Sequence, residues 1–318
     1  MSTVLVTGGA GFIGSHLCEK LLELGYWVIN LDNFNDFYDP KIKRKNILTA
    51  LSNRRYTLIE GDIRDRKLLE KIFNTFNIDT VVHIAALAGV RTSIGNPLEY
   101  VDVDIKGTVN LLEFSKDFKV KKFIFASTSS VYGLNSVPFK EDGKKSPISP
   151  YAAAKLAGEL FCSTYNVLYD IPVICLRFFT VYGPRQRPEM AVHYFTRLID
   201  EGKELPVWGD GTSSRDYTYI DDIINGIVAS IYHKCSFDIF NLGNSNPIKL
   251  NDLISLIEQK LGKSARRVYL PVQKGDAEHT YADITKSKAV LGYNPEVSIE
   301  EGIEKFIDWY KKQEYAQF

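Results

Sequence analysis

Short runs of β-branched and apolar residues alternate along the first part of the chain with stretches in which apolar residues recur every three or four positions. The first pattern is typical of strands buried on both faces, and the second of amphipathic helices. Regular alternation of the two predicts an α/β fold with a doubly wound parallel sheet. Strands are predicted at Thr3–Thr7, Trp27–Leu31, Thr57–Glu60, Thr80–Ile84, Lys122–Ser127, Val173–Phe178 and Phe237–Leu242.

Beyond Phe178 the pattern becomes irregular and rich in Gly, Pro, Arg and aromatic residues, before a last strand and a final helical region. We predict a sheet domain over 1–178, with 213–242 returning to it, and a smaller interleaved substrate-binding lobe over 179–212 and 243–318. Two helical stretches, Tyr100–Phe118 and Tyr151–Tyr169, combine apolar faces with aromatic residues. They are candidates for a dimer surface or, equally, for core packing.

Composition narrows the possible partners. The 318 residues are 45% hydrophobic, and Lys plus Arg and Asp plus Glu both total 39, so no basic field is available to attract nucleic acid or an anionic membrane. No apolar run approaches about 18 residues, so neither export nor membrane spanning is predicted. Four cysteines with no close pair suggest reduced core residues and the cytoplasm. They are Cys18, Cys162, Cys175 and Cys235.

A glycine-rich turn joins the first strand to the first helix. The turn contains Gly8, Gly11 and Gly14, which close the strand and open the helix. Phe12 and Ile13 begin the apolar pattern of that helix. Backbone amides in such a turn can bind a pyrophosphate, which predicts a Rossmann-type dinucleotide site. The alternative is a turn that only permits close packing of helix on strand.

Acidic and small residues follow the next strands. Asp32 ends the second strand, where a carboxylate would bind an adenosine ribose and repel a 2′-phosphate, so NAD is predicted rather than NADP. Asp62 is a candidate partner of adenine or, equally, the N-cap of a helix over Arg64–Phe73. Small side chains after the fourth strand would admit the cofactor or pack on the sheet. The remaining cofactor candidates are Asn33, Asn35, Ile63, Ala85, Ala86 and Ala88.

Tyr151 and Lys155 follow the hydroxyl-rich segment Ala126–Gly133. The residues around them read as a helix start, so the two side chains lie four positions apart on one face. A fixed ammonium and a cationic nicotinamide ring would stabilise the phenolate, making Tyr151 a usable general base. A surface Tyr–Lys pair on an amphipathic helix is the alternative.

Three motifs occur together: Thr7–Gly14, the Tyr151/Lys155 pair and Arg215–Asp222. Together they resemble the extended short-chain dehydrogenase/reductases that act on nucleotide sugars, and the likeness covers essentially the whole chain. Within that family, three further segments look like those of UDP-glucuronate 4-epimerases. These segments are Asp32–Asp39, Ala88–Arg91 and Tyr182–Ala191.

This resemblance implies NAD-dependent conversion of UDP-glucuronate to UDP-galacturonate through a 4-keto intermediate, with Tyr151 as the base and NAD⁺ as the transient hydride acceptor. It also implies a homodimer. Family dehydratases place Asp and Glu where this chain has Ser129 and Ser130, and decarboxylases typically carry Glu at the second position. The alternatives are a UDP-glucose/UDP-galactose 4-epimerase, a UDP-glucuronate decarboxylase, and a non-catalytic regulator that binds nucleotide sugars.

The resemblance also assigns roles around the sugar. Thr128 takes the hydroxyl role beside Tyr151, and Ser129 and Ser130 are neighbours that can orient the sugar, unless they only form a hydroxyl-rich strand end. Thr180 matches a sugar-contacting position, although it could equally cap a strand end. Because glucuronate carries a carboxylate, its recognition calls for a further charged group.

Arg187 is the predicted carboxylate clamp, because a guanidinium can bind a carboxylate in a bidentate manner; pairing with Glu189 is the alternative. Arg91 is a weaker second candidate. For the UDP part, Arg215 and Asp276 match diphosphate and ribose positions, and Trp208 could stack on uracil. Trp208 could instead anchor the core, and Asp276 could be a turn residue. Two departures from the family pattern are Gln273, in place of a common arginine, and Asp104, in place of the usual asparagine.

Overall fold

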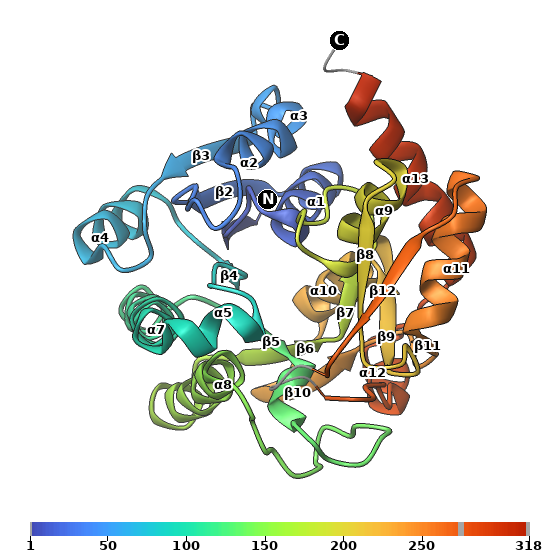
Figure 1. The fold of residues 1–318 in the computed structure, drawn as a ribbon. Coiled ribbons are helices and arrows are strands. Elements are labelled where there is room, and N and C mark those ends of the chain that lie inside the picture. Colours follow the sequence, from blue (N-terminus) through green and yellow to red (C-terminus); the bar gives the residue numbers. More distant parts are fainter. Residues whose placement is uncertain (1, 273–276, 316–318) are drawn as a thin grey trace.

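A seven-stranded parallel sheet forms the centre of the protein (Figure 1). The structure, a computed structural model, describes residues 2–272 and 277–315. The strand order is β10-β6-β5-β4-β1-β2-β3, which confirms the predicted doubly wound fold. Three predicted strands have the predicted bounds, and the other four differ by one residue at one end. The strands are β1 (Thr3–Thr7), β2 (Trp27–Asp32), β3 (Tyr56–Glu60), β4 (Thr80–His83), β5 (Lys122–Thr128), β6 (Val173–Phe178) and β10 (Phe237–Leu242).

Helices cover both faces of this sheet. Alternate residues of each strand point to opposite faces, so Val4 and Val6 join one buried cluster and Leu5 joins the other. The helices on the first face are α1 (Phe12–Glu23) and α10 (Ile220–Tyr232). Those on the second are α4 (Arg66–Thr75), α7 (Gly107–Asp117) and α8 (Pro150–Tyr169).

Short helices fill the connections that follow β2, β4 and β5. The predicted helical stretch Tyr100–Phe118 is interrupted: a π-helical segment, η1 (Val101–Lys106), precedes α7. A side chain at Gly107 would collide with Ile63, because its Cβ would lie 2.4 Å from Ile63 Cδ1, so this residue lets the helix approach the loop after β3 closely. The other short elements are α2 (Pro40–Asn46), α3 (Leu48–Leu51), α5 (Val90–Gly95), α6 (Pro97–Tyr100) and η2 (Ser129–Tyr132).

A smaller lobe lies beyond the carboxyl ends of the strands. It contains two small sheets, ordered β11-β9-β7 and β12-β8. Their strands are β7 (Thr180–Tyr182), β8 (Glu204–Trp208), β9 (Ser214–Tyr219), β11 (Pro247–Lys249) and β12 (Arg266–Leu270). The helices beside them are α9 (Ala191–Asp200), α11 (Leu250–Leu261), α12 (Thr285–Leu291) and α13 (Ile299–Tyr315).

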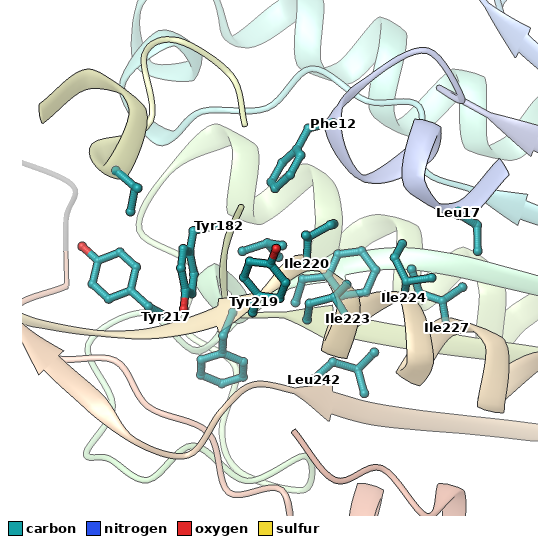
Figure 2. Packing of buried hydrophobic residues seen from close by; sticks show 14 of the residues in the cluster. Phe12, Leu17, Tyr182, Tyr217, Tyr219, Ile220, Ile223, Ile224, Ile227 and Leu242 are labelled. Carbon is teal, nitrogen blue, oxygen red and sulfur yellow. The ribbon is translucent and has the colours of Figure 1, made fainter. Parts of the chain in front are cut away.

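One apolar cluster joins this lobe to the central sheet. Figure 2 shows Tyr182 and Tyr219 beside Ile220 of α10, close to Leu242 at the end of β10. The segment 213–242, predicted to return to the sheet domain, is divided between the two parts. Its strand β10 belongs to the central sheet, whereas its strand β9 pairs with β7 and β11. We keep the division into a sheet domain and a substrate-binding lobe as a proposal. No helix within residues 2–272 and 277–315 is both long and apolar enough to cross a membrane.

Candidate active site

The site lies where the order of the central strands reverses. β1 pairs with β2 on one side and with β4 on the other, so the loops that follow these strands diverge and leave a crevice. Gly8 has φ +73°, and a Cβ there would lie 2.8 Å from Ala85 Cα in the loop after β4. Glycine therefore allows the two loops to approach each other at the reversal.

The glycine-rich turn places a helix N-terminus in this crevice. Gly11 is the N-cap of α1, and the helix begins at Phe12. A Cβ at Gly14 would lie 2.1 Å from Gly8 O, so the first turn of α1 packs directly on the loop and only glycine fits. The unpaired N–H groups of the first turn make this end of the helix suitable for a pyrophosphate.

Asp32 holds the edge of the crevice in place. The residue is buried, and its carboxylate accepts hydrogen bonds from Ala10 N and Phe34 N, both at 2.9 Å. The carboxylate thereby ties the glycine-rich turn to the segment that follows β2. Its position at the end of β2 leaves it beside the place where a ribose of a bound dinucleotide would lie.

A cavity of about 270 Å³ occupies the crevice. Every residue predicted to bind the cofactor lines it, together with Thr128 and Arg187 from the predicted catalytic and substrate sets. The sequence-predicted cofactor residues that it gathers are Gly8, Gly11, Phe12, Ile13, Gly14, Asp32, Asn33, Asn35, Asp62, Ile63, Ala85, Ala86, Ala88, Tyr151 and Lys155. The closely packed glycines, the helix N-terminus and the carboxylate at the end of β2 fit a dinucleotide.

The lining residues that were not predicted include Phe37, Tyr38, Lys43, Arg64 and Met190. The first three follow β2, whose carboxyl end faces the crevice; that position was the available signal. Lys43 donates from Nζ to the backbone oxygen of Asn35 at 2.7 Å, which fixes the course of this segment. Arg64 follows β3 directly after Ile63, so the same signal was available for it, whereas Met190 is brought to the cavity by tertiary packing.

Asp62 binds side chains at the rim of the cavity, and its alternative role as a helix N-cap is wrong. The next helix, α4, begins at Arg66, and Asp65 is its N-cap. Asp62 accepts hydrogen bonds from the Arg64 side chain and from Asn33 Nδ2. Burial alone would raise the pKa of Asp62, but these hydrogen bonds outweigh it and hold the pKa at about 2.

Tyr151 and Lys155 lie on the first turns of α8. Ser149 caps the helix by accepting from Ala152 N at 3.2 Å, and Pro150 occupies the first helical position. Because α8 begins at this point, both side chains line the cavity beside Thr128. Lys155 is buried and donates from Nζ to the backbone oxygen of Ala126 at 2.8 Å, so β5 fixes its ammonium.

Burial dominates the protonation of both side chains. It raises the pKa of Tyr151 to about 12, although the hydrogen bond with Thr128 and the positive charge of Arg187 act in the opposite direction. Burial lowers the pKa of Lys155 from its ordinary value, and the negative charge of Asp104 opposes that change. A neutral tyrosine in this cavity therefore needs added positive charge to become a base near pH 7.

A buried ion pair fixes α8 to the sheet behind these residues. Arg177 Nη2 lies 2.6 Å from Glu159 Oε2, and the side chains of both residues are buried. Ser127 Oγ donates to Glu159 Oε1 at 2.5 Å, next to Thr128 on β5. The ion pair therefore holds the tyrosine-bearing helix in register with the hydroxyl-bearing strand.

A second cavity, of about 130 Å³, collects four of the residues predicted to bind the sugar and diphosphate: Ser129, Ser130, Thr180 and Arg215. Arg215 donates from Nη1 to two backbone oxygens, those of Ser214 and Glu278, each at 3.0 Å. These residues come from η2, β7 and β9, so the second cavity lies between the central sheet and the smaller lobe.

The other predicted substrate residues contact protein groups. Arg187 Nε lies 3.1 Å from Glu189 Oε1, and its guanidinium stacks on Phe37 with Cζ 5.5 Å from the ring centroid. Arg91 stacks on Trp208, with Cζ 4.6 Å from the ring centroid, and so joins α5 to the end of β8. Asp276, and the departure at Gln273, lie outside the described residues.

The glycine-rich crevice and the tyrosine–lysine pair are the features expected of an extended short-chain dehydrogenase/reductase. The sequence profile of the GDP-mannose 4,6 dehydratase family matches residues 5–306. The chain belongs to this family, which is one of the extended short-chain dehydrogenase/reductases, and this confirms the predicted family.

Within the family, the chain is similar to sugar-nucleotide epimerases. It is 46% identical to the UDP-glucuronate 4-epimerase of Thermodesulfobacterium geofontis over 98% of this chain and 97% of that one. The crystal structure of the Bacillus cereus UDP-glucuronic acid 4-epimerase, in complex with UDP-glucuronic acid and NAD, superposes with a TM-score of 0.92. Its identity is 43%, covering 98% of this chain and 99% of that one.

The chain is also similar to an epimerase named for a neutral sugar. The UDP-glucose 4-epimerase of Thermotoga maritima, solved with UDP-glucose, superposes with a TM-score of 0.91 at 36% identity, covering 98% of this chain and 99% of that one. The fold by itself therefore does not separate uronate from hexose substrates.

Proposed function

We propose that this chain is an NAD-dependent UDP-glucuronate 4-epimerase, which interconverts UDP-glucuronate and UDP-galacturonate. The observation that carries the proposal is the convergence of Thr128, Tyr151 and Lys155 on the cavity lined by the glycine-rich turn. The likeness to UDP-glucuronate 4-epimerases over nearly the whole chain supports the same substrate.

The cofactor would lie along the first cavity. The N–H groups at the start of α1 would hold its pyrophosphate, and Asp32 would accept hydrogen bonds from the adenosine ribose. NAD⁺ held there would supply an acceptor for the hydride of carbon 4 and, once reduced, a donor for its return. Since Asp32 would repel a 2′-phosphate, NAD is the proposed cofactor rather than NADP.

Tyr151 would take the proton of the 4-hydroxyl group while hydride leaves carbon 4. Lys155, held by Ala126 O, would keep a positive charge near the phenolate, and Thr128 would donate a hydrogen bond to the same oxygen. The sugar then has to present its other face before hydride and proton return. Ser129 and Ser130 carry no carboxyl group at the positions where family dehydratases have acids, so elimination of water has no acid or base there.

The uronate carboxylate needs a cationic partner. Arg187 lines the first cavity and already holds a carboxylate, that of Glu189, so its guanidinium is suitably placed to exchange one carboxylate for another. Holding the substrate carboxylate would disfavour loss of carbon dioxide from the β-keto intermediate. Arg91 remains the second candidate.

Hydroxyl groups and a second arginine would bind the rest of the substrate. Ser129, Ser130 and Thr180 line the second cavity and can orient the sugar. Arg215 in the same cavity would bind the diphosphate, Trp208 would stack on uracil once its contact with Arg91 changes, and Asp276 is proposed for the ribose.

A substrate assay tests the proposal. Purified protein, without added cofactor, is incubated separately with UDP-glucuronate and UDP-glucose, and the products are separated by anion-exchange chromatography. We expect UDP-galacturonate from the uronate. Conversion of UDP-glucose alone would favour the second candidate, a UDP-glucose 4-epimerase, which the similarity to the Thermotoga structure supports. A UDP-pentose product would indicate decarboxylation, and no product from either substrate would favour a binding role.

A homodimer is also proposed, through the outer face of α8. Leu160, Val167 and Leu168 are exposed there, and their spacing places them on one stripe of the helix. Replacing Leu160 and Val167 together by Glu is expected to give monomers in analytical ultracentrifugation. Val290→Glu, at an exposed apolar residue of α12, is the control that should leave the oligomeric state unchanged. A wild-type monomer would contradict the dimer.

The proposed location is the cytoplasm. The structure has four free cysteines. Three of them are buried thiols of the core, Cys18, Cys162 and Cys175, and the fourth, Cys235, is partly buried. Reduced thiols of this kind suit a reducing compartment.

A further inference from the structure

Asp104 is a buried acid close to the catalytic pair that the proposed chemistry does not use. It lies in the π-helical segment η1 and is 2% exposed. Carboxylates are rarely buried to this extent unless they are paired. Its surroundings therefore need an explanation.

Only one oxygen of this carboxylate is hydrogen-bonded. Oδ1 accepts from Leu87 N at 2.7 Å, which holds the loop after β4 that lines the cofactor cavity. Oδ2 is buried and has no hydrogen-bond partner among the residues that the structure describes. An asparagine would satisfy Leu87 N equally well, so the hydrogen bond alone does not account for an acid.

The segment η1 packs against α8, the helix that carries Tyr151 and Lys155, so the ammonium of Lys155 is placed to supply the compensating charge. Burial raises the pKa of Asp104 to about 6, and the positive charge of Lys155 on α8 is the main effect that opposes this rise. The negative charge of Glu99 on α6 adds to the rise. In turn, the negative charge of Asp104 raises the pKa of Lys155 and of two tyrosines, Tyr100 on α6 and Tyr151 on α8.

A chain of hydrogen bonds connects the same segment to the core of the sheet. Thr108 on α7 donates to Asp104 O at 2.5 Å and contacts His83 Nε2 at 2.9 Å. Nδ1 of that histidine, on β4, lies 2.7 Å from Thr7 Oγ1. Burial holds the pKa of His83 well below its ordinary value, and Lys155 lowers it further, so this side chain adds no positive charge beside Asp104 near pH 7.

We propose that Asp104 is a positioning residue that acts on the catalytic pair as a buried counter-charge. Its carboxylate retains the positive charge of Lys155 and opposes negative charge on Tyr151, in addition to holding the loop after β4 through Leu87. The inference rests on the proposed function, because it assigns Asp104 to the proton transfer by Tyr151.

The charge effect has a definite sign. A base reacts in its unprotonated form, so the rising limb of a pH–rate profile follows Tyr151, and the falling limb follows loss of charge from Lys155. Removing the carboxylate makes the phenolate easier to form and the ammonium easier to lose. Both limbs should therefore move to lower pH.

Asp104→Asn is the decisive variant, since it keeps an acceptor for Leu87 N and removes only the charge. We expect its kcat/KM profile for UDP-glucuronate to move by about 0.5 pH unit or more toward acid, because a nearby charge shifts a buried pKa by an amount of this order or larger. A profile that superposes on the wild-type profile would overturn the proposal. Asp117→Asn, at an exposed acid on α7, is the control for the loss of one negative charge.

A spectroscopic titration tests the same point without turnover. Because the chain has 18 tyrosines, the tyrosinate absorbance of each NAD-loaded protein is measured with and without Tyr151→Phe, and the difference belongs to Tyr151. We expect Asp104→Asn to lower the pH at which this difference appears, and no change would overturn the proposal. Since no sugar is involved, the result stands even if the substrate assay contradicts the proposed epimerase function.

A third variant separates charge from positioning. Asp104→Ala removes the acceptor as well as the charge, so it should show the same acid shift and, in addition, weaker binding of NAD. If Ala weakens NAD binding while Asn leaves the titration of Tyr151 unchanged, Asp104 only holds the loop and the counter-charge role is wrong. Should the Asn variant fail to fold, Asp104→Ser, which is also uncharged, gives the same comparison.

Discussion

The two sides of the site are built differently. On the cofactor side, the loops after β1, β2 and β4 leave adjacent parallel strands, and hydrogen bonds such as Ala10 N to Asp32 tie them to each other. On the substrate side, Ser130, Thr180 and Arg215 come from three elements that are far apart in the sequence. Strand pairing therefore fixes the first side, whereas the packing of the smaller lobe fixes the second.

The side chains of the two sides also differ in what they contact. The glycines and Asp32 are already arranged as a dinucleotide site requires. Arg187, in contrast, pairs with Glu189, and Trp208 stacks with Arg91, so each would have to change partners to take its proposed role. Substitutions on the cofactor side and at the base should therefore have larger effects than substitutions on the substrate side.

Tyr151→Phe should have the largest effect, because it removes the proposed base, which lies between the two sides. We expect kcat to fall by roughly 100-fold or more, within the usual range for loss of a general base. NAD content and melting temperature should remain near the wild-type values, since only one hydroxyl group is lost. Steady-state kinetics and calorimetry would check this.

Tyr232→Phe, at an exposed tyrosine of α10, is the matched control and should leave kcat unchanged. If Tyr151→Phe retains more than about a tenth of the wild-type kcat, the barrier has changed by less than about 1.4 kcal/mol and Tyr151 is not the base.

Prediction from sequence succeeded where the backbone dictates the geometry. Gly8 follows β1, Gly11 is the N-cap of α1 and Gly14 lies in its first turn, and that order alone limits what the turn can do. The seven central strands were located because strands buried on both faces are nearly continuous apolar runs. The family followed from the same motifs.

Prediction was weaker where tertiary packing decides. Nothing in the local sequence indicates that Met190 would line the cavity or that Arg91 would stack on Trp208, since these contacts join separate elements. The interruption at η1 was also missed, because no glycine or proline marks it within Val101–Lys106. The roles of individual residues toward substrate stay predictions.

Gly14→Ala should have the next largest effect, on the cofactor side. The new Cβ would lie 2.1 Å from Gly8 O, a backbone atom that cannot move without displacing the turn. We expect a loss of at least about 2 kcal/mol in the free energy of unfolding, together with weaker NAD binding, as for other overpacked positions. Denaturant unfolding and titration with NAD would measure the two effects.

Gly95→Ala is the control for this substitution, because a Cβ there meets no atom within 4 Å. It should leave stability within about 0.5 kcal/mol of the wild type. Equal behaviour of the two variants would mean that the turn at Gly14 is not the rigid part of the site.

Arg187→Ala should have the smallest and most selective effect, on the substrate side. The guanidinium lies between Glu189 and Phe37 at the cavity, where it would exchange its partner for the substrate carboxylate. Loss of one charge-assisted contact costs roughly 1.4 kcal/mol or more, so kcat/KM for UDP-glucuronate should fall at least about tenfold, while a neutral UDP-hexose should be affected less. Parallel kinetics with both substrates would isolate the carboxylate.

Arg185→Ala is the matched control, since Arg185 pairs with Glu19 instead and does not line the cavity. An equal fall for both substrates in the Arg187 variant would make Arg187 a structural or phosphate-binding residue. Unchanged uronate turnover would move the clamp to Arg91. A pentose product formed only by the Arg187 variant would show instead that the guanidinium restrains decarboxylation. In that case the substrate side would control the fate of the intermediate as well as the choice of substrate.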